Sequence, residues 1–157
     1  MELKDFCLIF PSLFMIHEME EIILMPKFIS TNPFSTVTKK WLACYTPFNF
    51  NLVVFEQLLL LLIILTMSYQ QNDFTFYLTI IIAYSYHIIG HLLQSLFLRR
   101  YVPGLVSGII TGLFCSIFIQ HFIKNNIQLY YYSILTLLVI FMNIVLAFVF
   151  LNKISSK

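Results

Sequence analysis

Five long apolar segments limit what this chain can fold into. They cover about residues 5–25, 51–69, 74–98, 102–123 and 129–151, and each is 19–25 residues long. As an α-helix rising 1.5 Å per residue, each is long enough to cross the ~30 Å hydrocarbon core of a bilayer. Of all residues 60% are hydrophobic and only 10% are charged, whereas soluble domains have about 25% charged residues. The sequence therefore predicts one all-α domain over residues 1–157, a polytopic membrane bundle of about five transmembrane helices.

The same composition argues against two other classes of protein. The net charge is only +2, and no basic stretch is interleaved with aromatic residues, so we expect the lipid bilayer as a partner and no nucleic acid. The three cysteines are widely spaced and form no CxxC pair, which excludes a disulfide framework and a zinc ribbon. The sequence does not determine the oligomeric state, and a homodimer is possible.

The basic residues predict how the bundle is oriented. The one long connection, residues 27–50, contains Lys39, Lys40 and Trp41, and we expect it to be an exposed loop with an interfacial anchor. If five helices alternate in direction, seven of the nine Lys and Arg residues fall on the side of this loop. The positive-inside rule then puts loop 27–50 and the C-terminus in the cytoplasm and the N-terminus outside. We expect the plasma membrane of a bacterium.

Ionisable side chains inside the apolar segments are the first indication of function. Seven residues are of this kind: His17, Glu18, Glu20, Glu21, Glu56, His87 and His91. A charge at mid-membrane costs about 2.5–3.5 kcal/mol even on the scale derived from translocon insertion. These groups must therefore pair with one another, bind a metal or line a cavity.

Helical spacing gathers several of them on common faces. At 100° per residue, His17, Glu20 and Glu21 share one stripe of the first segment. In the third segment, His87 and His91 are at positions i and i+4, the spacing that lets two imidazoles share one ion. Three further polar residues lie on that face and could orient the histidines: Tyr84, Gln94 and Ser95.

Depth in the membrane gives a second grouping. Counted from the predicted cytoplasmic ends of their helices, Glu21, Glu56 and His91 all lie roughly 7–12 Å deep by the helical rise. Asn143 in the fifth segment lies at a similar depth. We therefore expect one site near the cytoplasmic face.

The row of Gly104, Gly108 and Gly112 indicates where a helix approaches closely. Small residues four apart form a ridge that allows a neighbouring helix to pack against the backbone. Pro103, just before this row, suits the first turn of the fourth helix.

Four sequence elements, in this order, resemble a known family. They are His17–Glu21 (HEMEE), the pair Asn51 and Glu56, the pair His87 and His91, and the Arg100–Gly104 turn. Over about residues 17–112 the chain resembles the HXXEE-domain membrane proteins. The resemblance implies a small multi-pass membrane protein and supplies no substrate.

The favoured hypothesis is a metal-dependent, hydrolase-type enzyme in the membrane. His17-x-x-Glu20-Glu21 differs from the inverzincin pattern HxxEH only in its last residue, which suggests His17 and Glu21 as ligands and Glu20 as general base. Further ligands would be Glu56, His87 and His91. Such a donor set suits Zn²⁺, with iron or a two-metal site as alternatives.

The substrate would be a lipid or a small hydrophobic molecule from the inner leaflet. Arg100 at the cytoplasmic rim could bind an anionic head group, and Asn51 and Asn143 could support the site or the substrate. Two other classes remain open: a metal or proton transporter, and a membrane protein whose polar network is purely structural.

Overall fold

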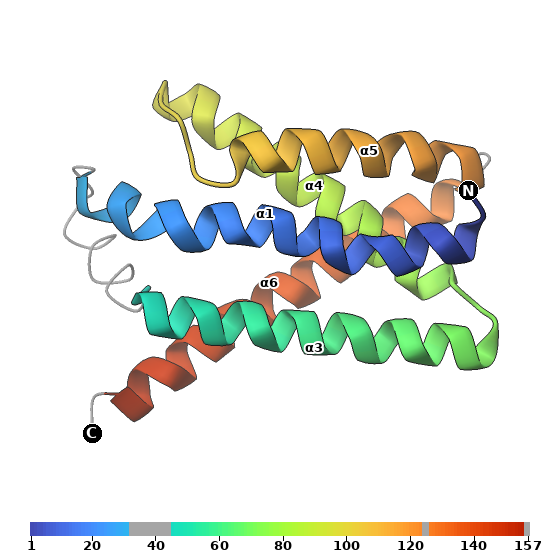
Figure 1. Cartoon of the computed structure of the whole chain (residues 1–157), viewed down its shortest axis with the longest axis horizontal. Coiled ribbons are helices and arrows are strands. Elements are labelled where there is room, and N and C mark those ends of the chain that lie inside the picture. The colour runs from blue at the N-terminus through green and yellow to red at the C-terminus, as the bar shows by residue number, and fades with distance from the viewer. Residues whose placement is uncertain (32–44, 124–125, 156–157) are drawn as a thin grey trace.

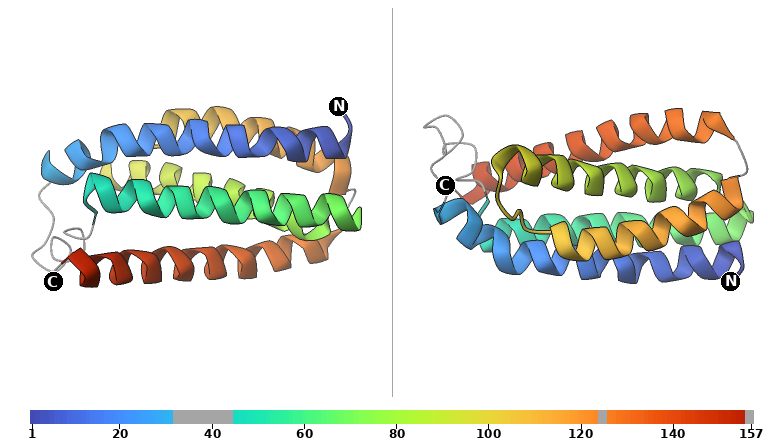
Figure 2. Two further views of the ribbon diagram at one scale, coloured as in Figure 1. Left: turned by 60° about the horizontal axis from the view of Figure 1, so that its bottom comes forward. Right: turned by 90° about the horizontal axis from the view of Figure 1, so that it is seen from above.

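The computed structural model describes residues 1–31, 45–123 and 126–155, and in these ranges every regular element is a helix. The helices are α1 (Leu3–Thr31), α3 (Pro47–Gln71), α4 (Thr75–Leu98), α5 (Leu105–Ile123) and α6 (Ile127–Ser155). They run along a common long axis, with α4 and α6 inclined to the other three in the view of Figure 1 (Figures 1 and 2). The predicted all-α bundle is confirmed.

Packing within the bundle places α4 between α5 and α6, while α1 packs against α3 and α5. The buried core fills the space between α1, α4 and α5, where Phe6 and Phe10 of α1 meet Tyr77, Ile81 and Cys115. Aromatic edge-to-face contacts extend this core along α1, since Phe10 packs on Tyr77 with centroids 6.0 Å apart. The core therefore packs α1 against α4 and α5 along the stretch that leads to His17.

Within the described residues, four helices are long and apolar enough to cross a membrane: α3, α4, α5 and residues Ile127–Ile154 of α6. The chain is thus an integral membrane protein. α1 is 29 residues long but carries three glutamates, and it is not among the four. The start of α1 and the end of α6 lie at opposite ends of the bundle, which suits an odd number of crossings (Figure 1). The direction of insertion stays a prediction.

The predicted loop 27–50 is shortened from both sides. α1 does not stop at Pro26 as the sequence suggested, but continues through it to Thr31. A proline removes one backbone hydrogen bond, which membrane helices tolerate when their surroundings compensate. α3 starts at Pro47 instead of residue 51, because the Thr46 side chain caps it by accepting from the Asn49 N–H at 3.2 Å. Lys39, Lys40 and Trp41 lie outside the described residues.

The start of α5 also differs from the prediction. The helix begins at Leu105 and not at 102, so Pro103 lies in the preceding turn. Gly104 has a φ of 84°, which no right-handed helix accommodates. A Cβ at Gly104 would lie 2.7 Å from both Glu21 Oε1 and His17 Cε1, and one at Gly108 would lie 3.2 Å from His17 Nδ1. The small-residue row thus brings the start of α5 against the polar part of α1.

Candidate metal centre

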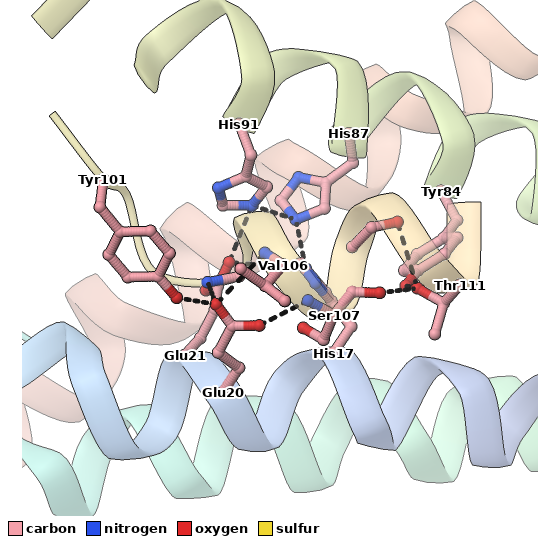
Figure 3. Close-up of polar contacts among 12 residues, drawn as sticks. His17, Glu20, Glu21, Tyr84, His87, His91, Tyr101, Val106, Ser107 and Thr111 are labelled. Atoms are coloured by element: carbon pink, nitrogen blue, oxygen red, sulfur yellow. Dashed lines mark hydrogen bonds and ion pairs between the residues drawn. The ribbon is translucent and has the colours of Figure 1, made fainter. Parts of the chain in front are cut away.

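Four ionisable side chains from two helices meet inside the bundle. α1 contributes His17 and Glu21, and α4 contributes His87 and His91, each pair at spacing i, i+4 (Figure 3). One ligand atom from each residue lies within 4.8 Å of all the others. The sequence grouped each pair correctly on its own helix, and the fold brings the two pairs face to face.

The separations in this cluster match those of ligands around one small cation. Nε2 of His87 lies 2.9 Å from Nε2 of His91 and 3.3 Å from Nε2 of His17. Oε1 of Glu21 lies 2.8 Å from Nε2 of His91 and 3.5 Å from Nε2 of His17. A tetrahedral ion with bonds of 2.0–2.1 Å has its ligands about 3.3 Å apart. These four distances lie near that value and all ligand atoms lie within 4.8 Å of one another, so the residues could hold one ion as a His₃Glu site.

The chemistry of the three imidazoles also favours a shared cation or proton. All three turn Nε2 inward, and a neutral imidazole nitrogen either donates a hydrogen or accepts one. Three such nitrogens around a shared centre need a proton or a cation between their lone pairs. Beside them, Glu21 supplies the single negative charge of the group.

The site is closed on the α1 side and open at His87. The side chain of His17 is fully buried, and Glu21 and His91 are only 6% and 7% exposed. His87 is exposed, and it lines a groove of about 390 Å³ between α4 and α6. A molecule from the surrounding bilayer can therefore reach the cluster from one direction.

Glu20, the predicted general base, occupies a different position from the rest of its motif. Its Oε2 accepts from the Ser107 N–H at 2.6 Å, and its Oε1 accepts from the N–H groups of Gly104 at 3.1 Å and Val106 at 3.4 Å. The Tyr101 hydroxyl also donates to Oε1 (Figure 3). Val106 and Ser107 are the second and third residues of α5, so Glu20 caps this helix from another element.

This cap changes the properties of the turn before α5. Partial burial, together with the hydrogen bond to the Glu20 carboxylate and its charge, raises the pKa of Tyr101 to about 12. The cap also explains why α5 can begin directly after Gly104, which has no side chain to satisfy the first N–H groups. Nothing in the sequence pattern alone indicated that Glu20 and Ser107 would pair.

Glu56 is not brought into the group of four. Its Oε1 accepts from Asn143 Nδ2 at 3.3 Å, and Asn143 Oδ1 in turn accepts from Gln57 Nε2 at 2.6 Å. Glu56 and Asn143 thus form a separate polar contact between α3 and α6. Equal depth did not imply equal position around the bundle axis, which is why the sequence placed Glu56 among the ligands.

The remaining predicted residues contact other parts of the fold. The Tyr84 ring packs edge-on against the His17 ring with centroids 5.5 Å apart, while its hydroxyl lies 2.6 Å from Thr111 Oγ1. Gln94 lines the groove beside His87. Asn51 donates to the Pro47 carbonyl of its own helix at 2.9 Å and is exposed. Arg100 lies in the turn between α4 and α5.

Comparison with known protein families identifies the family that carries this motif. A family model described as "Protein of unknown function with HXXEE motif" matches residues 8–119. The chain belongs to the HXXEE family. No curated protein and no solved structure shows significant similarity to it. In this HXXEE protein, the outer residues of the motif, His17 and Glu21, contribute to the cluster, and Glu20 caps α5.

Proposed function

We propose that this HXXEE protein is a metal-dependent membrane enzyme of the hydrolase type that acts on a lipid-like substrate. The observation that carries the proposal is the convergence of His17, Glu21, His87 and His91 within 4.8 Å in a membrane helical bundle. Isolated ionisable groups are costly in such a place, and a shared cation would balance them. Three imidazole nitrogens and one carboxylate oxygen favour Zn²⁺, with iron as the alternative.

The donor set supports one ion better than two. Two-metal sites in helical bundles use several bridging or terminal carboxylates in addition to histidines. Here Glu21 is the only acid in the group, because Glu20 caps α5 and Glu56 bonds Asn143. We therefore propose a mononuclear site.

An ion at this site would polarise a carbonyl or phosphoryl oxygen and acidify a nearby water molecule. The chain supplies the rest of the chemistry. Glu21 is the carboxylate next to the imidazoles, and its contacts suit a ligand that can also accept a proton. The general-base role moves from Glu20 to Glu21, because both Glu20 oxygens already accept backbone hydrogen bonds. The buried α1 side keeps bulk water away, so the substrate would approach past His87.

The test is a search for a metal-dependent change in lipids. Purified protein loaded with Zn²⁺ would be incubated with a polar lipid extract of its host membrane, and lipid species would be followed by mass spectrometry. We expect one lipid class to decline and its two hydrolysis fragments to rise, with no change for metal-stripped protein or for His91→Ala. Glu56→Gln is the matched control and should act like the wild type, since Glu56 lies outside the cluster. Metal-loaded protein that leaves every lipid unchanged would contradict the enzymatic role and favour transport.

A further inference from the structure

The groove at the open side of the cluster has two unlike walls. The α4 wall carries His87, Gly90 and Gln94, and the α6 wall carries Leu138 and Phe141. Leu138 and Phe141 are 55% and 58% exposed, although α4 and α6 pack against each other. Because both helices are membrane-spanning candidates, we expect lipid hydrocarbon in the space outside this groove. The groove thus joins a polar end to an apolar wall in contact with lipid.

Gly90 stands out because nothing within the described chain explains it. A Cβ at this position would meet no atom within 4 Å, and its φ is not positive. A glycine inside a helix costs about 0.8–1 kcal/mol relative to alanine. Gly104 and Gly108 gain close helix contacts in return, but Gly90 gains none within this chain. Its missing side chain leaves room for a molecule from outside.

Gln94 supplies a polar group in the same groove. It follows His87 and His91 at positions i+7 and i+3, so all three lie on one face of α4. Its side-chain amide has no hydrogen-bond partner among the residues that the structure describes, and it is exposed. An amide at this depth can donate to and accept from one oxygen-bearing group of a ligand.

We propose that this groove binds a single-chain lipid, with its hydrocarbon chain passing Gly90 along Leu138 and Phe141 and its polar group between Gln94 and His87. This assignment rests on the proposed function and specifies its substrate class. The volume of about 390 Å³ lies at the lower end of the ~300–1,000 Å³ typical of small-molecule pockets, which suits one chain better than a two-chain phospholipid.

The groove suits a second copy of this protein less well. Close helix pairing in membranes uses small residues repeated every four positions. The positions four residues before and after Gly90 are Tyr86 and Gln94, both large. A helix with side chains is also about 10–12 Å wide, more than a single glycine gap admits.

The experiment uses diazirine-labelled palmitic acid as the probe, added to the full chain in detergent micelles, with crosslinked peptides identified by mass spectrometry. Wild-type protein should be labelled on the segment that contains Leu138 and Phe141. Gly90→Phe should fill the groove, because a Cβ at this position meets no atom within 4 Å, and should lower this labelling about tenfold or more. The matched control is Ile89→Phe, one residue away, 51% exposed and outside the groove, which should label like wild type. A two-chain diazirine phosphatidylglycerol should not label the groove.

Bound metal is measured on the same samples, which separates this proposal from the previous one. Gly90→Phe should keep the metal content of the wild type, because it leaves all four ligands in place. Metal-loaded Gly90→Phe that is labelled as strongly as wild type would overturn the groove assignment alone. Wild-type protein that binds no metal after reconstitution but is still labelled in the groove would overturn the proposed metal-dependent enzyme and support the lipid site. A shift from dimer to monomer in Gly90→Phe, with no groove labelling in the wild type, would assign the groove to a second copy and overturn the lipid site.

Discussion

The substitution Glu20→Gln distinguishes a helix cap from a general base. The amide keeps the size of the side chain but removes its charge and one of its two acceptor oxygens. In the wild type, Oε2 accepts from Ser107, while Oε1 accepts from Gly104, Val106 and the Tyr101 hydroxyl. With an NH₂ group in place of one oxygen, at least one backbone N–H at the start of α5 loses its acceptor.

The size of the effect follows from that lost contact. Hydrogen bonds to a charged group contribute about 1.5–3 kcal/mol, and loss of a helix N-cap costs about 0.5–2 kcal/mol. The two figures describe the same contacts and do not add. Because Glu20 is only partly buried, we expect the lower part of the range, a loss of about 1–2 kcal/mol.

The assay is reversible unfolding in mixed detergent micelles, followed by circular dichroism, for wild type, Glu20→Gln and Glu18→Gln. Glu18 lies on the same helix, and its carboxylate makes no hydrogen bond within the described part of the chain, so its amide variant should not lose stability. Both variants should bind metal under saturating conditions. Unchanged stability of Glu20→Gln, together with loss of lipid turnover, would refute the cap and restore Glu20 as the general base.

Three further predictions concern the same turn and the membrane topology. Gly104→Ala should lower both stability and metal content, because its Cβ would lie 2.7 Å from Glu21 Oε1 and the residue has a φ of 84°. Gly90→Ala is the control and should lower neither, so equal behaviour of the two variants would contradict the close approach of α5 to Glu21. Tyr101→Phe should be less stable than wild type below pH 10. Because the folded-state pKa of Tyr101 is raised to about 12, this difference in the free energy of unfolding should persist to pH 10 and disappear toward pH 12. A difference that does not vary with pH would exclude the role of the hydroxyl. A reporter active only in the cytoplasm should work after Lys157 and fail before Met1; activity at both ends would show that α1 does not cross.

Spacing along each helix predicted the four residues of the candidate site as two separate pairs, but not that the two pairs meet. The i, i+4 pairs His17–Glu21 and His87–His91 were evident because side chains four residues apart share a face. The same reasoning put Glu20 on the same helix face as His17, but it could not show which neighbouring helix Glu20 contacts. Glu21 faces α4 and Glu20 faces the start of α5, a difference fixed by tertiary packing.

Membrane depth and helix ends were predicted less well than helical faces. Depth in the membrane is one coordinate, so it grouped Glu56 with His91 although Glu56 contacts Asn143 on α6. The early start of α3 had a local signal, Thr46 followed by Pro47, which the later apolar run obscured. The cap on α5 had a weaker local signal. A helix that begins after Gly104 has no capping side chain of its own, so its first N–H groups need an acceptor from another element.

The most direct test of the metal centre is the metal content of the purified protein. Inductively coupled plasma mass spectrometry would be applied to wild type, to single alanine variants of His17, Glu21, His87 and His91, and to Glu56→Gln as the control. The His₃Glu geometry predicts about one zinc or iron per chain in wild type and in Glu56→Gln, and a large loss in each alanine variant. Wild-type protein that binds no transition metal after reconstitution, or alanine variants that keep all of it, would contradict the site.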